Sequence, residues 1–178
     1  MGVEETNPIH VSIGQFYGIE INDFAATVAK TALWIAESQM MKQTEDIVHM
    51  NLDFLPLKSY VNIVEGNALR LDWETVVSKA ELNYIMSNPP FVGYSLQSEE
   101  QKKDILSIYV DEKGKSYKTA GKIDYVAGWY WKAAQLIQGT NIRTAFVSTN
   151  SITQGEQVAG IWKPLYDRFG IHIDFAHR

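Results

Sequence analysis

The sequence contains no cysteine. Disulfides, cysteine nucleophiles and cysteine-based zinc sites are therefore excluded, and the composition fits a reducing cytoplasm. No run of about 18 apolar residues is present, so we expect no membrane span. Residues 1–5 have neither the basic nor the apolar region of a signal peptide. The histidines are scattered without metal-ligand spacing, at His10, His49, His172 and His177. We therefore expect a cytoplasmic protein with no membrane contact and no metal site.

Basic charge is also scarce, because 16 lysines and arginines face 21 aspartates and glutamates, for a net charge of -5. A free-standing DNA-binding module is usually basic, since phosphate contacts dominate its affinity. The charge argues against autonomous DNA binding, but not against a catalytic domain that takes DNA affinity from a neighbour. The 178 residues suffice for one domain with a sizeable core.

Strand-like and helix-like patterns alternate along the chain. The expected strands are 16–21, 60–64, 83–87, 143–148 and 171–175. The expected helices are 24–41, 73–80, 124–137 and a mostly helical 156–169 with a break or kink at Pro164. Asn22 is the expected N-cap of the first helix, whose buried face should hold Phe24, Val28, Ala32, Ile35 and Met40, widened by Leu33. This alternation predicts an α/β fold with a mostly parallel, helix-covered sheet.

The segment 97–122 reads as a loop-like insertion. It has six lysines from Lys102 to Lys122 against three acidic residues, which gives a local charge of 6 - 3 = +3. The favoured interpretation is a solvated, mobile loop. The alternative is a DNA-facing flap that contacts phosphates beside a site.

Asn88-Pro89-Pro90-Phe91 follows the third expected strand. The Asn88 side-chain oxygen and the Pro89 carbonyl can accept hydrogen bonds from the two hydrogens of an amino group. The prolines fix the backbone and remove competing donors, and a residue before proline is held extended. Phe91 offers a face for stacking a base turned out of a duplex. This set suits methylation of the adenine amino group, although a plain turn explains the tetrapeptide alone equally well.

Glu20 and Asn67 end the two preceding strands, and ligands of parallel sheets bind beyond such ends. Glu20, followed by Ile21, can bind both ribose hydroxyls of an adenosine-containing cofactor. Asn67 can accept from an adenine amino group, with Ala68 and Leu69 packing near the ring. Taken singly, a helix-start carboxylate and a turn asparagine are the commoner explanations. Three strand ends in chain order favour the cofactor interpretation.

The motifs 17–21, 64–69 and 88–91 resemble those of the amino-methylating DNA methyltransferases that use S-adenosylmethionine. Segments 124–130, 145–157 and 173–178 look like the adenine-specific methylase region of large restriction-modification proteins, and the resemblance covers nearly all of residues 14–178. It implies a Rossmann-like fold and methyl transfer to N6 of adenine in double-stranded DNA. The catalytic residues would be Asn88, Pro89, Pro90 and Phe91, and the cofactor-binding residues Glu20, Ile21, Asn67, Ala68 and Leu69. Asparagine rather than serine before the prolines favours adenine over cytosine.

Two features depart from that family. Its glycine-rich cofactor loop and the strand before it should precede the Glu20 strand, yet Gly2 and Gly14 are the only glycines in residues 1–15. Asn67 also stands where aspartate is common. We therefore expect residues 1–15 to be a tail or an expression remnant. Residues 16–178 would be a partial catalytic domain, inactive alone, of a larger protein with target-recognition and nuclease domains.

The missing strand normally lies between the Glu20 strand and the Asn88 strand. Its absence should leave a gap or force those two strands to pair directly, with self-association covering the exposed edges. Alternatives for the activity are methylation of a glutamine amide in protein or of guanine amino groups in RNA. A further alternative, from another class, is a non-catalytic scaffold or interaction unit.

Overall fold

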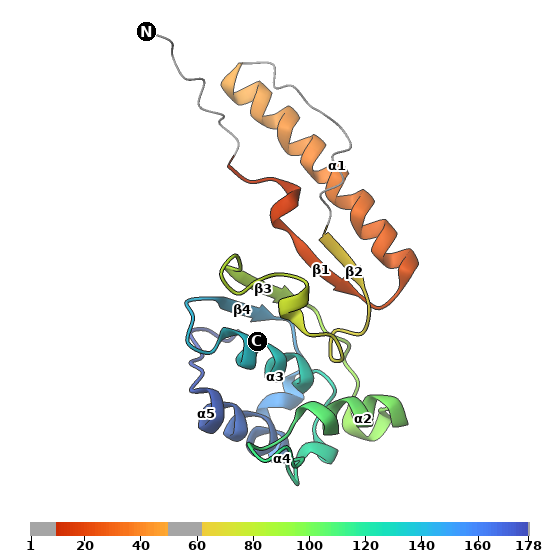
Figure 1. Ribbon diagram of the computed structural model, residues 1–178, viewed down its shortest axis with the longest axis vertical. Helices are drawn as coiled ribbons and strands as arrows, with labels where there is room; N and C mark the ends of the chain where they lie inside the picture. The colour runs from red at the N-terminus through yellow and green to blue at the C-terminus, as the bar shows by residue number, and fades with distance from the viewer. Residues whose placement is uncertain (1–9, 50–61, 178) are drawn as a thin grey trace. The chain divides into compact units, whose positions relative to one another are not determined.

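The computed structural model describes residues 10–49 and 62–177. The chain divides into two compact units, Met1–Ala68 and Leu69–Arg178 (Figure 1). Within the described residues, no helix combines the length and apolarity needed to cross a bilayer.

The first unit is a βαβ arrangement. Strands β1 (Tyr17–Glu20) and β2 (Asn62–Glu65) pair in parallel, and helix α1 (Asp23–Val48) connects them and lies along their sheet (Figure 1). The register places Glu20 opposite Glu65, so both strands end at the same edge. The predicted strand 60–64 begins two residues earlier, but residues 60 and 61 lie outside the described part of the chain.

Helix α1 begins as predicted, because the Asn22 side chain accepts a hydrogen bond from the Ala25 N–H (3.0 Å). It ends at His49, whose φ of 53° is left-handed. The expected end at residue 41 is too early, since no glycine or proline interrupts the following turns. Before β1, Ile13 is buried and its N–H donates to Glu37 on α1 (3.2 Å). Ile13 therefore contacts α1 within the part of the predicted tail that the structure describes.

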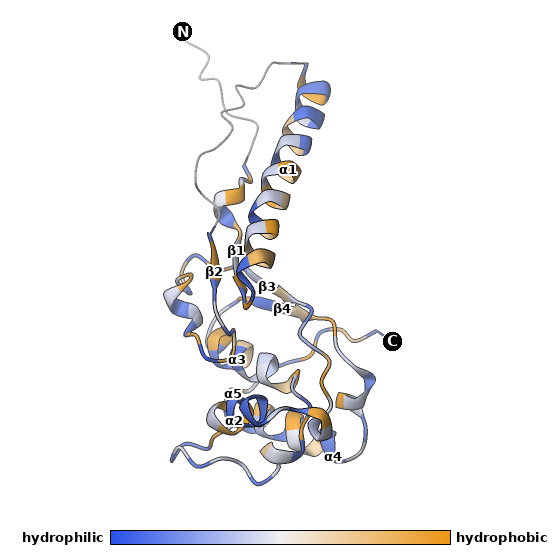
Figure 2. Ribbon diagram, turned by 90° about the vertical axis from the view of Figure 1, so that its right-hand side faces the viewer, coloured by the Kyte–Doolittle hydropathy of each residue, from blue (hydrophilic) through white to orange (hydrophobic). Residues whose placement is uncertain are grey.

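The predicted buried face of α1 is wrong. Phe24 is 74% exposed and Ile35 54% exposed, with Val28 and Met40 also exposed. Of the predicted residues only Leu33 is half-buried, and the buried Ala26 is not among them. Figure 2 shows apolar segments along the whole of α1, and a helix with apolar residues on both faces carries no periodic signal that says which face is covered.

The second unit is built on strands β3 (Tyr84–Ser87) and β4 (Arg143–Phe146), which pair in parallel with Ser87 opposite Phe146. Helices α2 (Glu99–Ile108) and α3 (Ala127–Ile137) lie in the crossover between them. After β4, α4 (Gly155–Gln157), a π-helical turn (Val158–Trp162) and α5 (Lys163–Phe169) follow one another without a break. These helices gather on one side of the strand pair (Figures 1 and 2).

The predicted break at Pro164 coincides with this π-helical turn. Pro164 stands in the first turn of α5, where its missing N–H costs least. The wider turn immediately before it accommodates the lost helical hydrogen bond, as such turns commonly do. The prediction of a mostly helical segment over 156–169 is therefore confirmed.

The segment 97–122, predicted to be loop-like, contains helix α2. Ser98 and Gln101 form a capping box at its start, and Ile105 and Tyr109 are fully buried. Lysine content alone predicts a loop here, and it overlooks the helical spacing of the apolar residues. The turn at residues 111–115 is ordered by Asp111, whose side chain accepts hydrogen bonds from the N–H groups of residues 113 and 115. Those bonds lower the pKa of Asp111.

Two other predicted elements differ. The helix expected over 73–80 is a single 3-10 turn, Trp73–Thr75, capped by Asp72. The strand expected over 171–175 has no strand partner among the described residues, and these residues follow the left-handed Gly170 that ends α5. A strand requires a neighbour for its backbone groups, which the apolar pattern alone does not guarantee.

The α/β class and the parallel pairing are confirmed, but the four described strands form two separate two-stranded sheets instead of one. Pairing is β1 with β2 and β3 with β4, so the Glu20 strand and the Asn88 strand do not pair directly. Of the two expected outcomes, direct pairing of these two strands is therefore not observed among the described residues.

The core of the second unit is rich in aromatic rings. Trp131 on α3 packs against Tyr109 and Phe169, with ring centroids 4.2 and 5.0 Å away. Gly128 permits a close approach, because a Cβ there would lie 2.8 Å from the Leu69 side chain. This core joins α2, α3 and α5 beneath β3 and β4.

The two faces of α1 should respond differently to truncation. Leu33→Ala removes half-buried apolar surface and should lower the free energy of unfolding by about 1–3 kcal/mol. Phe24→Ala on the exposed face should change it by less than about 0.5 kcal/mol. Urea denaturation followed by circular dichroism measures both values, and a larger loss for Phe24→Ala would contradict the assignment of faces.

Candidate active site

The loop that follows β3 presents two hydrogen-bond acceptors. Asn88 is exposed, and within the described part of the chain neither its side-chain oxygen nor the Pro89 carbonyl oxygen receives a hydrogen bond. Pro89 itself is buried, which fixes the backbone from which both acceptors project. The loop therefore offers an amide oxygen and a carbonyl oxygen, adjacent in the chain, to an external donor.

Phe91 stands beside these acceptors with 51% of its surface exposed. Its neighbour Val92 packs on the core and accepts a hydrogen bond through its carbonyl from the Tyr125 N–H (2.9 Å). The Val92 N–H donates to the Pro90 carbonyl (3.1 Å), which makes a tight turn at Phe91. The ring is thus carried on a fixed backbone while its own surface remains available.

Asp124 is buried behind this loop at 7% exposure. Its Oδ1 accepts from the Tyr94 N–H (3.0 Å) and its Oδ2 from the Ser151 hydroxyl (2.5 Å). The Asp124 N–H donates to the Gln157 side chain (3.0 Å). One carboxylate therefore binds the loop after β3 and the turn after β4.

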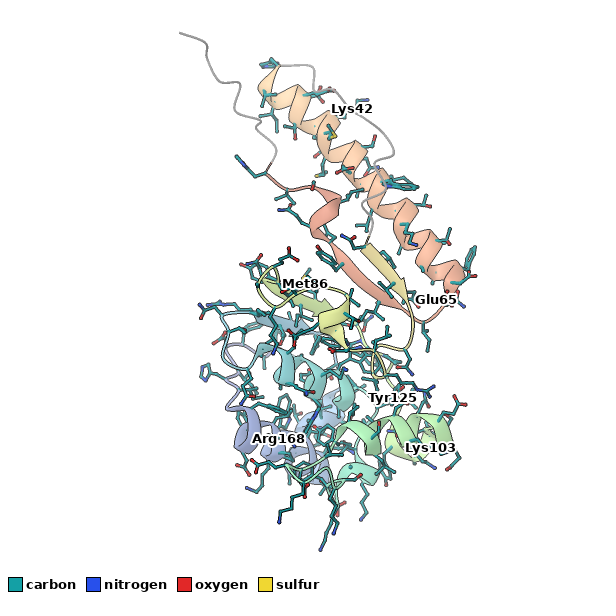
Figure 3. The ribbon with its side chains drawn as sticks, in the orientation of Figure 1. Lys42, Glu65, Met86, Lys103, Tyr125 and Arg168 are labelled. Atoms are coloured by element: carbon teal, nitrogen blue, oxygen red, sulfur yellow. The ribbon has the colours of Figure 1, made fainter. Side chains whose placement is uncertain are left out.

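A second buried carboxylate lies on α2. Asp104 is 5% exposed and accepts from the Arg70 Nε–H (2.7 Å) and from the Tyr125 hydroxyl (3.0 Å), the latter side chain labelled in Figure 3. The bond and charge of Asp104 raise the pKa of Arg70. Asp104 thus ties α2 to the start of the unit and to the segment before α3.

In the first unit, Glu20 and Asn67 follow the ends of neighbouring strands, as predicted. The Gly66 N–H donates to the Glu20 carbonyl (2.9 Å), so the parallel pairing continues to the last residue of β1. The Glu20 side chain accepts from the Asn22 N–H through one oxygen (3.3 Å), and no cation in the described residues pairs with it. Glu65, labelled in Figure 3, lies at the matching position of β2.

The remaining predicted cofactor residues occupy different environments. Ile21 is 69% exposed and Ala68 is half-buried. Leu69, predicted to pack near an adenine ring, is only 2% exposed, and its side chain lies in the core of the second unit against Ile105. Burial of this kind leaves the Leu69 side chain no surface for a ligand.

The structure brings predicted residues together within each unit. Glu20 and Asn67 share one strand edge, and Asn88, Pro89, Pro90 and Phe91 form one loop. The meeting of these two groups at a single site stays a prediction. Among the described residues, no three histidine, aspartate or glutamate side chains could hold a metal ion.

Sequence reasoning missed Asp124 and Ser151 as parts of this site. Asp124 stood at the start of an expected helix, and both residues lay in segments that resemble methylases, but neither was given a role. They are 27 positions apart, with helix α3 and strand β4 between them, and only the folded chain brings them into hydrogen-bond contact. No local pattern could have identified the pair.

Comparison with known proteins places these features in a family. The family model for the MmeI DNA-methyltransferase domain matches residues 2–178. DNA methyltransferase A of Bacillus subtilis (strain 168) is 44% identical over 171 residues, which are 94% of this chain and 19% of that protein. The solved structure of the Type IIL restriction-modification enzyme MmeI in complex with DNA matches with a TM-score of 0.82 and 45% identity, over 89% of this chain and 21% of that one.

The chain spans about a fifth of the length of these two relatives. The family match extends over almost every residue, including most of the segment predicted to be a tail. The chain therefore belongs to the family of MmeI DNA-methyltransferase domains.

Proposed function

We propose that this chain is part of the catalytic domain of a DNA methyltransferase in a restriction-modification enzyme, and that it methylates N6 of adenine with S-adenosylmethionine. The observation that carries the proposal is the pair of unoccupied acceptors on Asn88 and Pro89 beside the exposed Phe91 ring. The family supports DNA methylation. The relatives' greater length supports further domains, including one for target recognition, in the same polypeptide.

An amino group with two hydrogens is the donor that fits two adjacent acceptors. The lone pair of the adenine amino nitrogen is delocalised into the ring, which makes it a poor nucleophile. Hydrogen bonds from both hydrogens to Asn88 and Pro89 would pull the nitrogen toward a tetrahedral geometry and localise that lone pair. Stacking on Phe91 would hold the base outside the duplex.

The methyl donor, when bound, supplies a methyl group on a positively charged sulfur. Its S–C bond would break as the new N–C bond forms on the amino nitrogen held by Asn88 and Pro89, and the surplus proton of that nitrogen would then leave to solvent. No general base is required beforehand, and the Asn88 amide remains neutral throughout. The contribution of the protein is to position and polarise the amino group.

The residues at the β1–β2 edge fit an adenosine group. Glu20 has one carboxylate oxygen bound by its own chain and no cation partner among the described residues, so it can accept from ribose hydroxyls. Asn67 follows the neighbouring strand and has an amide oxygen that can accept from an adenine amino group. The flanking Ile21 and Ala68 offer apolar surface beside it.

Replacing Asn88 tests the acceptor role. In the complete polypeptide that contains this chain, Asn88→Ala should lower kcat for adenine methylation by about 10²-fold or more, because one preorganised polar contact is lost. The measurement is transfer of labelled methyl groups to DNA, with RNA and protein pools assayed in parallel.

Asn83→Ala is the matched control for this change. Asn83 is an exposed asparagine just before the other end of β3, where its carbonyl accepts a hydrogen bond from the Arg143 N–H. The control should retain activity. Undiminished adenine methylation by Asn88→Ala, or transfer to RNA or protein alone, would overturn the proposed function.

Replacing Glu20 tests cofactor binding separately. Glu20→Ala should raise KM for S-adenosylmethionine by about ten- to a hundredfold with a smaller change in kcat, since hydrogen bonds to a charged group contribute about 1.5–3 kcal/mol. Glu65→Ala removes a carboxylate at the matching strand position and should leave KM unchanged. Equal effects of both changes would argue against a specific role for Glu20.

A further inference from the structure

We propose that Asp124 is a positioning residue for the base-binding loop, setting the place of Asn88 and Phe91 through the backbone that follows them. This inference rests on the proposed function, because it assigns Asp124 a part in holding the same target base. The loop in question is 88–94, from the end of β3 to the first residue of the turn Tyr94–Leu96.

The side chains that would meet the base are not held by packing of their own. Asn88 is exposed and receives no hydrogen bond within the described part of the chain. Phe91 is half exposed, and it is Val92, the next residue, that packs on the core. Where Asn88 and Phe91 point is therefore decided by how the loop backbone is fixed.

Asp124 and Tyr125 form hydrogen bonds with that backbone at two nearby points. The Tyr125 N–H binds the Val92 carbonyl (2.9 Å), and Asp124 Oδ1 accepts from the Tyr94 N–H (3.0 Å). Gly93 lies between these two points, and a Cβ built there would make ordinary contact with Asp124 Oδ1, at 3.8 Å, so the carboxylate lies directly beside the loop backbone. Among the described residues, the buried Asp124 carboxylate is the only side-chain group that accepts a hydrogen bond from the backbone of loop 88–94.

The second carboxylate oxygen of Asp124 binds the turn that follows the neighbouring strand, β4. Ser151 donates to Oδ2, and its hydroxyl oxygen lies 2.7 Å from Thr149 Oγ1, in the turn after β4. Ser87 and Phe146 are paired at the ends of the two strands, and the Val147 N–H binds the Ser87 carbonyl (3.1 Å). Asp124 consequently closes a bridge between two loops that leave the sheet side by side.

Asp104 provides a matched comparison within the same unit. Both carboxylates are buried, Asp104 at 5% and Asp124 at 7% exposure, and both accept side-chain or backbone hydrogen bonds. Asp104 binds Arg70 and Tyr125 but no residue of the loop 88–94. Loss of either side chain should destabilise the fold. Asp124 binds the loop directly, whereas Asp104 reaches it only through Tyr125, so loss of Asp124 should disturb the loop more.

The test compares Asp124→Ala, Asp124→Asn, Ser151→Ala and Asp104→Ala in the complete polypeptide, each assayed below its own melting temperature. Asp124→Ala should lower kcat for adenine methylation about tenfold or more relative to Asp104→Ala, with KM for S-adenosylmethionine unchanged. Asp124→Asn should restore kcat to within about threefold of the natural enzyme. Its amide oxygen can accept from Tyr94 and its NH2 can donate to Ser151.

Ser151→Ala keeps the Tyr94 bond and should give an intermediate kcat, which preserves the test if Asp124→Ala fails to fold. Hydrogen exchange of the Tyr94 amide should accelerate in Asp124→Ala and not in Asp104→Ala.

Equal kcat in the Asp124→Ala and Asp104→Ala proteins, or a natural kcat in Ser151→Ala, would overturn the proposal. Asn88→Ala assayed alongside separates the two ideas: active Asn88→Ala refutes the proposed function, whereas inactive Asn88→Ala with equal Asp variants refutes only the role of Asp124.

Discussion

The parallel pairing of β3 with β4 is the constraint on which the candidate site depends. Parallel strands end at the same edge, so the loop after Ser87 and the turn after Phe146 leave the sheet side by side. Two distant segments thereby supply the hydrogen bonds of one buried carboxylate. Without that pairing, Asn88 and Phe91 would stand on a loop with little to fix it.

The site combines a fixed backbone with the exposed side chains of Asn88 and Phe91. Burial of Asp124 strengthens its hydrogen bonds, because few water molecules compete for its oxygens. The Asn88 oxygen, in contrast, remains exposed and available. A group that must bind a substrate cannot be satisfied by the protein, so the support for its position has to come from neighbouring backbone.

The two strand pairs and helix α1 are alike in being covered on one side. Each pair has helices on one face, and α1 has apolar residues on both its sheet-facing and its exposed sides (Figure 2). Parallel sheets usually lie between two layers of helices. The exposed Phe24, Val28 and Ile35 are therefore a property of this fold, and they explain why periodicity selected the wrong face of α1.

Local signals in the sequence determined the α/β class, the Asn22 cap, the parallel strands and the position of Asn88 after β3, because each depends on neighbouring residues. Local signals failed where partners decide the outcome. The apolar residues 171–175 find no strand to pair with among the described residues, the lysine-rich 97–122 contains helix α2, one side of which is buried, and Leu69 enters the core. The tertiary structure alone decided the role of Asp124, since its donors come from segments that only the β3–β4 pairing brings into contact.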